Sequence, residues 1–394
     1  MVAEIRTQVG IVGAGPAGLL LSHLLHRAGV SSVVIDTRSR DEIESTIRAG
    51  ILEQGTVEVL SESGASARVL TDGHRHEGIE LRFDGAGHRI DFADLVGRAV
   101  WLYPQHEVLK DLIAARLADG GEVKFGWTAS DVVGVESESP TIVGTHDHGT
   151  AFEIVADFVV GSDGSHSSVR AAVTESQPGY FREYPFAWFG ILCDAPPSAP
   201  ELIYSASDEG FALVSQRSDT VQRMYLQCDP ELDPASLSEA QIWDSLQTRL
   251  GGGLIEGPIF QRDVLRFRSF VARELQRGNA FLVGDAAHTV PPTGAKGMNL
   301  AIADVLLLNA ALRTHYRDGS RVLLDGYADA ARDRIWRAQH FSWWMTSMLH
   351  AVPEESEFDR QRRYGELTSI TRSRGGSQYL AEAYTGWPLD ADWR

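Results

Sequence analysis

Residues 7–36 read TQVGIVGAGPAGLLLSHLLHRAGVSSVVID, and this stretch decides the fold. A short β-rich run at 7–12 is followed by Gly13, Gly15 and Gly18 in the spacing G-x-G-x-x-G. An amphipathic helical pattern starts there, and a second apolar run follows it. This order of strand, glycine turn, helix and strand predicts a Rossmann-type βαβ unit.

The glycines and one distal acid indicate what this unit binds. A side chain at these glycines would block a pyrophosphate from the helix N-terminus, whose free N–H groups and dipole bind anions. The second strand, residues 32–35, ends in Asp36, at the spacing where a carboxylate accepts hydrogen bonds from a ribose. The βαβ unit therefore predicts a bound dinucleotide, and its glycines alone do not say which one.

Composition restricts the class of protein. With 394 residues and 43% hydrophobic residues, the chain is long enough for two or three domains of an enzyme. A net charge of −18 disfavours nucleic acid or an anionic membrane as the main partner. Cys193 and Cys228 lie far apart without metal-ligand spacing, which favours a reducing cytoplasm and no metal site. The sequence also lacks a signal-peptide pattern and a run long enough to cross a bilayer.

Two later segments favour FAD over NAD. The strand-like run 154–160 ends in a stretch that contains Asp163, and the run 281–283 ends in Gly284 and Asp285. An extended flavin carries a ribitol chain, whose hydroxyls can donate to Asp285 while small neighbouring residues keep the backbone close. Three separated strand ends with glycine are typical of the flavoprotein aromatic hydroxylases.

The chain resembles the class A flavoprotein aromatic hydroxylases that act on 4-hydroxybenzoate. The resemblance runs from residue 8 to about residue 388 and is not confined to cofactor motifs. Further matching stretches lie at residues 48–54, 76–78, 184–188, 201–204, 215–218, 290–297 and 341–347.

The resemblance implies a fold and a reaction. The expected fold is α/β, with a Rossmann-type FAD-binding domain interrupted by a β-rich (α+β) substrate domain. The expected boundaries are 1–178 for the FAD domain, with a substrate-facing excursion near 76–100, 179–270 for the substrate domain, and 271–394 for the return and a helical C-terminal region at a homodimer interface. The implied reaction converts 4-hydroxybenzoate to 3,4-dihydroxybenzoate (protocatechuate) with O2 and NADPH or NADH, through a flavin C4a-hydroperoxide.

The residues themselves support a carboxylate-binding wall. Runs 211–217 and 221–228 flank a short turn and predict a hairpin. Residues two apart in a strand share a face, so Ser215 points with Arg217, and Arg223 points with Tyr225. Guanidinium groups bind carboxylates bidentately, and hydroxyls take the remaining lone pairs. We expect Ser215, Arg217 and Tyr225 to hold the substrate carboxylate.

The resemblance also assigns the groups that ionise the substrate phenol. Tyr204 is expected to contact the phenol oxygen, Tyr384 to lie behind it, and a surface His76 to end the proton route, while the Pro292 carbonyl faces the same oxygen. A phenol has a pKa near 10, and a hydrogen bond to a charged group lowers it by about one to two units. Several groups in series are therefore expected.

The remaining assignments concern the cofactor and coenzyme. The helix expected from about Met298 directs its N-terminus at the flavin, and Lys296 is expected to add positive charge, or else to be solvated. The expected FAD contacts are Gly13, Gly15, Gly18, Asp36, Arg48, Gln105, Asp163, Arg223, Asp285, Gly297, Met298 and Asn299. The expected NAD(P)H contacts are His166, Arg268, Arg38 and Arg40. Acidic residues at 41, 42 and 44 and a threonine at 46 leave the choice between NADPH and NADH open.

Two alternatives remain open from the sequence. One is a hydroxylase for another para-substituted benzoate, such as 4-aminobenzoate, held by the same wall. The other is a non-catalytic, redox-responsive flavoprotein, which is expected to lack that wall. A disulfide reductase is disfavoured because the two cysteines are not paired in sequence.

Overall fold

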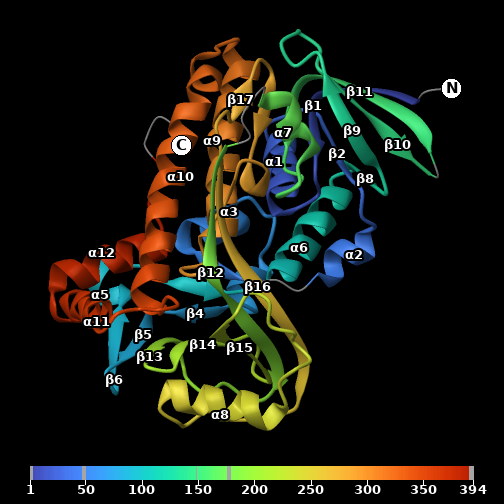
Figure 1. The fold of residues 1–394 in the computed structure, drawn as a ribbon. Helices are drawn as coiled ribbons and strands as arrows, with labels where there is room; N and C mark the ends of the chain where they lie inside the picture. The colour runs from blue at the N-terminus through green and yellow to red at the C-terminus, as the bar shows by residue number, and fades with distance from the viewer. Residues whose placement is uncertain (1–2, 47–49, 148, 175–178, 390–394) are drawn as a thin grey trace.

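The computed structural model describes residues 3–46, 50–147, 149–174 and 179–389. Two large sheets lie one above the other, and the long helix α10 (Val322–Leu349) runs beside both (Figure 1). The predicted contact Arg48 and the predicted boundary at residue 178 lie outside the described residues.

The upper sheet, which we call the Rossmann sheet, has the order β17-β18-β11-β1-β2-β8, with β10 and β9 added beside β11. β1 pairs in parallel with both β2 and β11, and β11 pairs in parallel with β18, as a Rossmann-type unit requires. Its strands are β1 (Ala3–Val12), β2 (Ser32–Asp36), β8 (Glu122–Phe125), β9 (Thr128–Val133), β10 (Thr141–His146), β11 (Thr150–Gly161), β17 (Gln276–Arg277) and β18 (Ala280–Leu282).

The register of this sheet brings its glycine-bearing strand ends together. Val12 pairs with Gly161, and Gly161 pairs with Leu282. The three turns that follow β1, β11 and β18 therefore lie side by side at the carboxyl edge, where α/β sheets bind ligands. The predicted α/β fold class is confirmed.

The lower sheet, which we call the second sheet, has the order β19-β16-β12-β15-β14-β13-β5-β6. β14 and β15 form the predicted hairpin, and β5 joins it from the N-terminal half by pairing in parallel with β13. Its strands are β5 (Gly78–Phe83), β6 (Ala86–Asp91), β12 (Gly179–Asp194), β13 (Leu202–Ser207), β14 (Gly210–Gln216), β15 (Val221–Cys228), β16 (Ile259–Ala272) and β19 (His288–Thr289). A small third sheet consists of β3 (Ile51–Glu53), β7 (Val100–Leu102) and β4 (His74–His76).

Side chains alternate between the two faces of the hairpin β14–β15, and each face packs against a different hydrophobic cluster. Ala212, Val214 and Met224 share a buried cluster with apolar residues of α8 (Glu239–Leu250). Leu213 and Tyr225 lie on the opposite face, where they share a cluster with residues of α10 and the C-terminal helices. The hairpin is therefore buried on both faces, and its polar residues point between the two halves of the molecule.

Helices accompany both large sheets. The other helices are α1 (Pro16–Arg27), α2 (Arg40–Ser45), α3 (Gln54–Glu62), α4 (Arg68–Thr71), α5 (Phe92–Val96), α6 (Gln105–Ala118), α7 (Ser168–Val173), the 3-10 turn η1 (Gly284–Ala286), α9 (Lys296–Asp318), α11 (Glu357–Arg372) and α12 (Arg374–Thr385). The helix predicted from Met298 to about residue 312 is longer at both ends. Among the described helices, none combines the length and apolar character needed to cross a membrane.

Candidate active site

The turn after β1 has the geometry of an anion site. Gly13 has φ +108°, and a Cβ there would lie 2.4 Å from the carbonyl oxygen of Ser162. A Cβ at Gly18 would lie 2.1 Å from the carbonyl oxygen of Gly13, so that glycine permits close packing of α1 on the turn. At Gly15 the nearest atom would be 4.0 Å away, and no side chain caps the helix there. Open space beside free N–H groups fits a pyrophosphate.

Asp36 fixes this turn from the neighbouring strand. Its Oδ2 accepts from the backbone N–H of Ala14 at 2.8 Å, and Arg38 donates to both carboxylate oxygens at 3.0 and 2.8 Å. The acid predicted for the ribose thus lies at the expected strand end. Both of its oxygens are already hydrogen-bonded within the protein.

The other two strand ends supply further acceptors. Asp163 uses Oδ2 to accept from Ser168 at the start of α7, at 2.7 Å from the backbone nitrogen, while Oδ1 is buried without a partner among the described residues. Asp285 is partly exposed in η1, and no described residue donates a hydrogen bond to its carboxylate. An available carboxylate beside the glycine turn of β1 fits a polyhydroxyl chain. The residues present therefore fit FAD.

Two glycines where the turn leads into α9, Gly294 and Gly297, differ in their surroundings. Gly294 has φ +82°, and a Cβ there would lie 2.7 Å from the ring of Phe341. Gly297 has open space, with Val290 at 3.9 Å as the nearest atom. Gly294 is thus required by its own backbone and by Phe341, whereas Gly297 leaves room for a flavin. The N-terminus of α9 has no side-chain cap, so its N–H groups are free to meet negative charge.

The side chain of Asn299, a predicted FAD contact, is used within the protein. The Asn299 side chain accepts from Glu53 and Thr56 at 2.9 and 2.8 Å and donates to the carbonyls of Ile51 and Ala295 at 2.9 and 2.8 Å. Its donors and acceptors are therefore occupied, and the backbone at 297–299 remains for the cofactor.

Lys296 is not a solvated lysine. It is 2% exposed and donates to Glu53 at 2.5 Å and to the carbonyl of Tyr384 at 3.1 Å. Burial lowers the pKa of Lys296, and Glu53 opposes that shift.

The predicted substrate wall forms. Ser215 pairs with Arg223, Leu213 pairs with Tyr225, and Tyr204 pairs with Leu213, so these side chains share one face of the second sheet. Arg217 continues this face and has no carboxylate partner among the described residues, while its Nε is buried without a hydrogen bond. Burial lowers the pKa of Arg217, and Tyr225 stabilises its charge.

The second guanidinium of this face belongs to Arg223, a predicted FAD contact, and it already has a carboxylate partner. Arg223 is 2.6 Å from Asp263 and lies 4.9 Å from the ring centre of Tyr225. Its charge is already balanced, so Arg217 is the cation left for a ligand on this wall. Asp263 had no signal in the sequence, because β16 brings it to the wall from forty residues away.

The predicted tyrosine pair also forms. The hydroxyl oxygens of Tyr204 and Tyr384 lie 2.7 Å apart, and both side chains are about 1% exposed. Burial raises the pKa of Tyr204, and hydrogen bonds from Tyr384 and from the backbone of Gly294 oppose that shift. Pro292 begins the adjacent turn, and its carbonyl accepts from Ala295 at 3.1 Å. The tyrosine pair therefore lies beside the turn that contains Pro292 and Gly294.

His76 is placed differently from the prediction. It is 2% exposed rather than at the surface, and neither ring nitrogen has a hydrogen-bond partner among the described residues. Burial lowers the pKa of His76 to about 4, although Glu201 opposes the shift. No described hydrogen bond joins it to Tyr384. His76 lies in β4, a short strand of the third sheet, where it pairs with Val100 of β7, and the sequence did not reveal this pairing.

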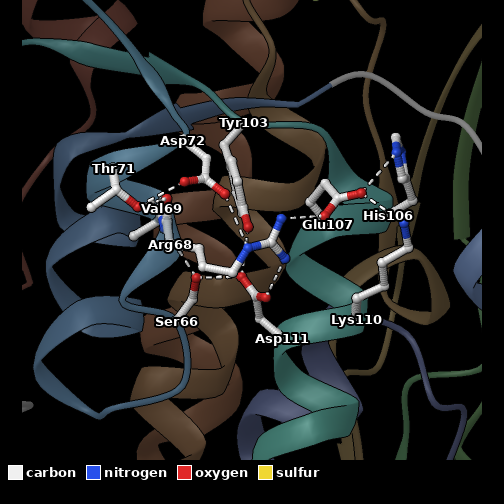
Figure 2. Close-up of polar contacts among 10 residues, drawn as sticks. All are labelled: Ser66, Arg68, Val69, Thr71, Asp72, Tyr103, His106, Glu107, Lys110 and Asp111. Carbon is white, nitrogen blue, oxygen red and sulfur yellow. Dashed lines mark hydrogen bonds and ion pairs between the residues drawn. The ribbon is translucent and has the colours of Figure 1, made fainter. Parts of the chain in front are cut away.

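The start of α6 is fixed by a charged network (Figure 2). Arg68 donates to Glu107 at 2.7 Å and to Asp111 at 2.8 Å, and the Tyr103 hydroxyl also donates to Asp111. This network anchors the first two turns of α6, where Gln105 is the first residue. It holds Gln105, the predicted FAD contact, on a rigid element.

The predicted coenzyme residues form two groups. Arg268 donates to the Ser165 hydroxyl at 3.1 Å, and His166 lies 3.3 Å from the same hydroxyl. Arg170, which the sequence did not single out, joins them through the Ser165 carbonyl. In the sequence, Arg170 lies in the same stretch as Asp163, and this position could have indicated a role at the site.

Arg38 and Arg40 form the second group, at the end of β2. Arg38 binds Asp36, and Arg40 binds Glu44 at 2.6 Å. Glu42 belongs to a capping box with Ser39 and so has a structural use.

The comparisons with known proteins identify the family of the chain. Residues 6–342 match the FAD binding domain family. The chain belongs to the class A flavoprotein aromatic hydroxylases, and it is an FAD-dependent monooxygenase. A p-hydroxybenzoate hydroxylase from Acinetobacter baylyi is 42% identical to it over 98% of this chain and 96% of its own.

More distant relatives share the fold. A 6-methylpretetramide 4-monooxygenase from Streptomyces rimosus is 28% identical over 87% of this chain and 84% of its own. The crystal structure of p-nitrophenol 4-monooxygenase from Pseudomonas putida superposes with a TM-score of 0.80 at 20% identity, over 98% of this chain and 100% of that one.

Proposed function

We propose that this hydroxylase converts 4-hydroxybenzoate to 3,4-dihydroxybenzoate with O2 and NADPH or NADH. The observation that carries the proposal is one sheet face that bears Arg217, which has no carboxylate partner among the described residues, and Tyr204, whose hydroxyl meets that of Tyr384 from α12. One end of this face suits a carboxylate and the other suits a phenol oxygen. The name of the Acinetobacter relative supports the same substrate.

Arg217 provides the charge for the carboxylate end. Arg217 is partly buried with its Nε unpartnered, so a carboxylate that enters beside it gains charge-assisted hydrogen bonds. The Ser215 hydroxyl, which now donates to the carbonyl of Gln216 at 3.2 Å, and the Tyr225 phenol can donate to the remaining lone pairs. A benzoate is thus held by its carboxylate with the ring directed along the wall.

Tyr204 provides a donor for the phenol end. Burial keeps its hydroxyl protonated, and Tyr384 is the second hydroxyl through which a proton can pass. Ionisation of the substrate phenol enriches its ring in electrons, which favours attack at the carbon next to the oxygen. Because His76 is buried and unlinked, we propose that the proton route proceeds from Tyr384 by another exit.

FAD would lie along the carboxyl edge of the Rossmann sheet. We propose that the turn at Gly13–Gly18 holds its pyrophosphate, that Asp285 holds its ribitol, and that the backbone from Gly297 faces its ring. When bound and reduced, FAD activates O2 for transfer to the aromatic ring. The protein contributes placement, exclusion of water and the state of the phenol proton.

We propose that NAD(P)H binds near His166, Arg268 and Arg170, which gather around Ser165 beside the turn of β11 and include two guanidinium groups. Arg38 and Arg40 contribute less to the selection of a 2′-phosphate, because carboxylates of the same segment already bind them.

One assay tests the substrate assignment and separates it from the alternative. NADPH and NADH oxidation is measured with a panel of para-substituted benzoates, and the products are identified by mass. We expect 4-hydroxybenzoate to give the greatest stimulation and a product heavier by one oxygen. Preferential hydroxylation of 4-aminobenzoate would replace this proposal with the sister activity.

We further propose a homodimer in the cytoplasm. Tyr180, Phe181, Trp336 and Trp343 expose between 38% and 61% of their surfaces, and Tyr180 and Trp336 are in edge contact at 5.4 Å. Exposed aromatic groups of this kind mark interaction surfaces. Light scattering of the purified protein measures the mass directly, and Trp336→Glu is expected to yield monomer.

A further inference from the structure

Beneath the turn that carries Asp285 lies a buried acid and base pair that the proposed mechanism does not use. Asp304 of α9 is 1% exposed, and His288 of β19 is fully buried. Their Oδ2 and Nε2 atoms are 2.7 Å apart. No other described cation or carboxylate forms an ion pair with either residue.

The same carboxylate oxygen also determines the backbone of the turn. Asp304 Oδ2 accepts the N–H of Gly284 at 2.9 Å. Gly284 has φ +61°, and a Cβ there would lie 3.1 Å from Ala301 of α9. The residue before Asp285 is therefore held in a left-handed conformation against α9, and its N–H donates to the buried Asp304 side chain.

Two further contacts hold the segment around that turn. The Tyr327 hydroxyl of α10 donates to the carbonyl of Leu282 at 2.8 Å, and Ala272 donates to the carbonyl of Ala287 at 2.8 Å. His288 itself pairs with Val271 across β16 and β19. The pair thus connects α9, the second sheet and the end of β18, and Asp285 is the partly exposed residue between Gly284 and Ala286 in this segment.

We propose that Asp304 and His288 are positioning residues for FAD, which fix Gly284 and thereby direct the Asp285 carboxylate toward the ribitol hydroxyls. This inference rests on the proposed role of Asp285. Asp304 contributes through geometry rather than contact, since its Oδ2 is shared between Gly284 and His288, and its Oδ1 is buried without a hydrogen-bond partner among the described residues. When Asp304 no longer fixes Gly284, the Asp285 carboxylate points in another direction. FAD affinity then falls even though the overall fold is intact.

The test is a double-mutant cycle on FAD binding. Apoprotein is titrated with FAD, and the dissociation constant is read from flavin fluorescence for wild type, Asp304→Asn, Asp285→Asn and the double variant. We expect each single variant to bind FAD about 10- to 100-fold more weakly, the range typical of a lost supporting contact. The double variant should be no more than about twofold weaker than Asp285→Asn alone, because both changes remove the same interaction.

A matched control separates positioning from stability. Glu355 and Arg363 form another buried ion pair, with two contacts of 3.0 Å, far from the Rossmann edge. Glu355→Gln should lower the melting temperature of the apoprotein and leave the FAD dissociation constant unchanged. If Asp304→Asn does not fold, His288→Leu, which removes the hydrogen-bond partner of Asp304, enters the same cycle.

Two outcomes overturn different statements. If Asp285→Asn binds FAD like wild type, the proposed ribitol contact is wrong. The second outcome is that Asp285→Asn weakens FAD binding as expected while the fold-losses of the two single variants multiply in full in the double variant. In that case Asp304 acts independently of Asp285, and the positioning role is wrong.

Discussion

The hydroxyl oxygens of Tyr204 and Tyr384 lie 2.7 Å apart although the two residues are separated by 180 positions in the chain. Tyr204 comes from β13 of the second sheet, and Tyr384 comes from α12. The pair therefore exists only when the C-terminal helices are docked on the second sheet.

Tyr204→Phe should uncouple the reaction. The change keeps the ring and removes one hydrogen bond to a charged phenolate, about 1.5 to 3 kcal/mol. The pKa of the bound phenol should rise by about one to two units, so that NAD(P)H oxidation continues while most O2 becomes hydrogen peroxide. The ratio of dihydroxybenzoate to NAD(P)H consumed measures this.

Tyr184→Phe is the matched control, since Tyr184 is also buried but its hydroxyl faces Ser269 at 3.2 Å. It should keep wild-type coupling. If Tyr204→Phe does the same and the titration of bound substrate is unshifted, Tyr204 is a packing residue.

Arg217→Lys should weaken 4-hydroxybenzoate binding by roughly 10- to 100-fold, which corresponds to about 1.5 to 3 kcal/mol. Lysine offers a point charge in place of the planar fork. Arg223→Lys should have a smaller effect, because Asp263 already balances Arg223. Substrate titration of the flavin absorbance gives both constants, and equal affinity of wild type and Arg217→Lys would place the carboxylate elsewhere.

Acid should destabilise the protein through His76. Its pKa is about 4 in the folded protein and 6.5 ordinarily, so between these values unfolding takes up a proton that the folded state excludes. Stability conferred by the neutral histidine is present above pH 6.5 and is lost as the pH falls toward 4.

His76→Gln should reduce the slope of unfolding free energy against pH by up to about 1.4 kcal/mol per pH unit in that window. His350, whose pKa burial lowers to about 3, keeps a slope of the same sign in the variant. Urea unfolding between pH 4.5 and 8 compares the two proteins, and the slopes above pH 7 should agree. Identical slopes below pH 6 would show that His76 is already protonated or solvated.

NADPH and NADH should be used with similar efficiency, with a slight preference for NADPH. Arg38 and Arg40 attract a 2′-phosphate, but Asp36 and Glu44 bind them, and the neighbouring acids repel it. The comparison of kcat/KM for the two coenzymes checks this. A ratio beyond about a hundredfold, near 2.7 kcal/mol, would mean that one group dominates.

Local patterns predicted the Rossmann unit, the hairpin and the long helix, because each depends on residues close in sequence. The wall formed as expected because alternation in β14 and β15 alone decides which side chains share a face. Long-range pairing accounts for the errors. Asp263 of β16 reaches Arg223 of β15 across β12, and Glu53 reaches Lys296 from more than 240 residues away. No spacing rule connects such residues.

The second sheet is assembled from three separate lengths of chain, since β5 and β6 precede it and β19 follows it. During synthesis this sheet cannot be completed until residue 289 has left the ribosome, and a fragment limited to 179–270 would expose the edge of β13 that β5 covers. The face that bears Tyr204 is completed only when Tyr384 of α12 has docked beside it, and the excised fragment is expected to aggregate rather than to bind benzoates.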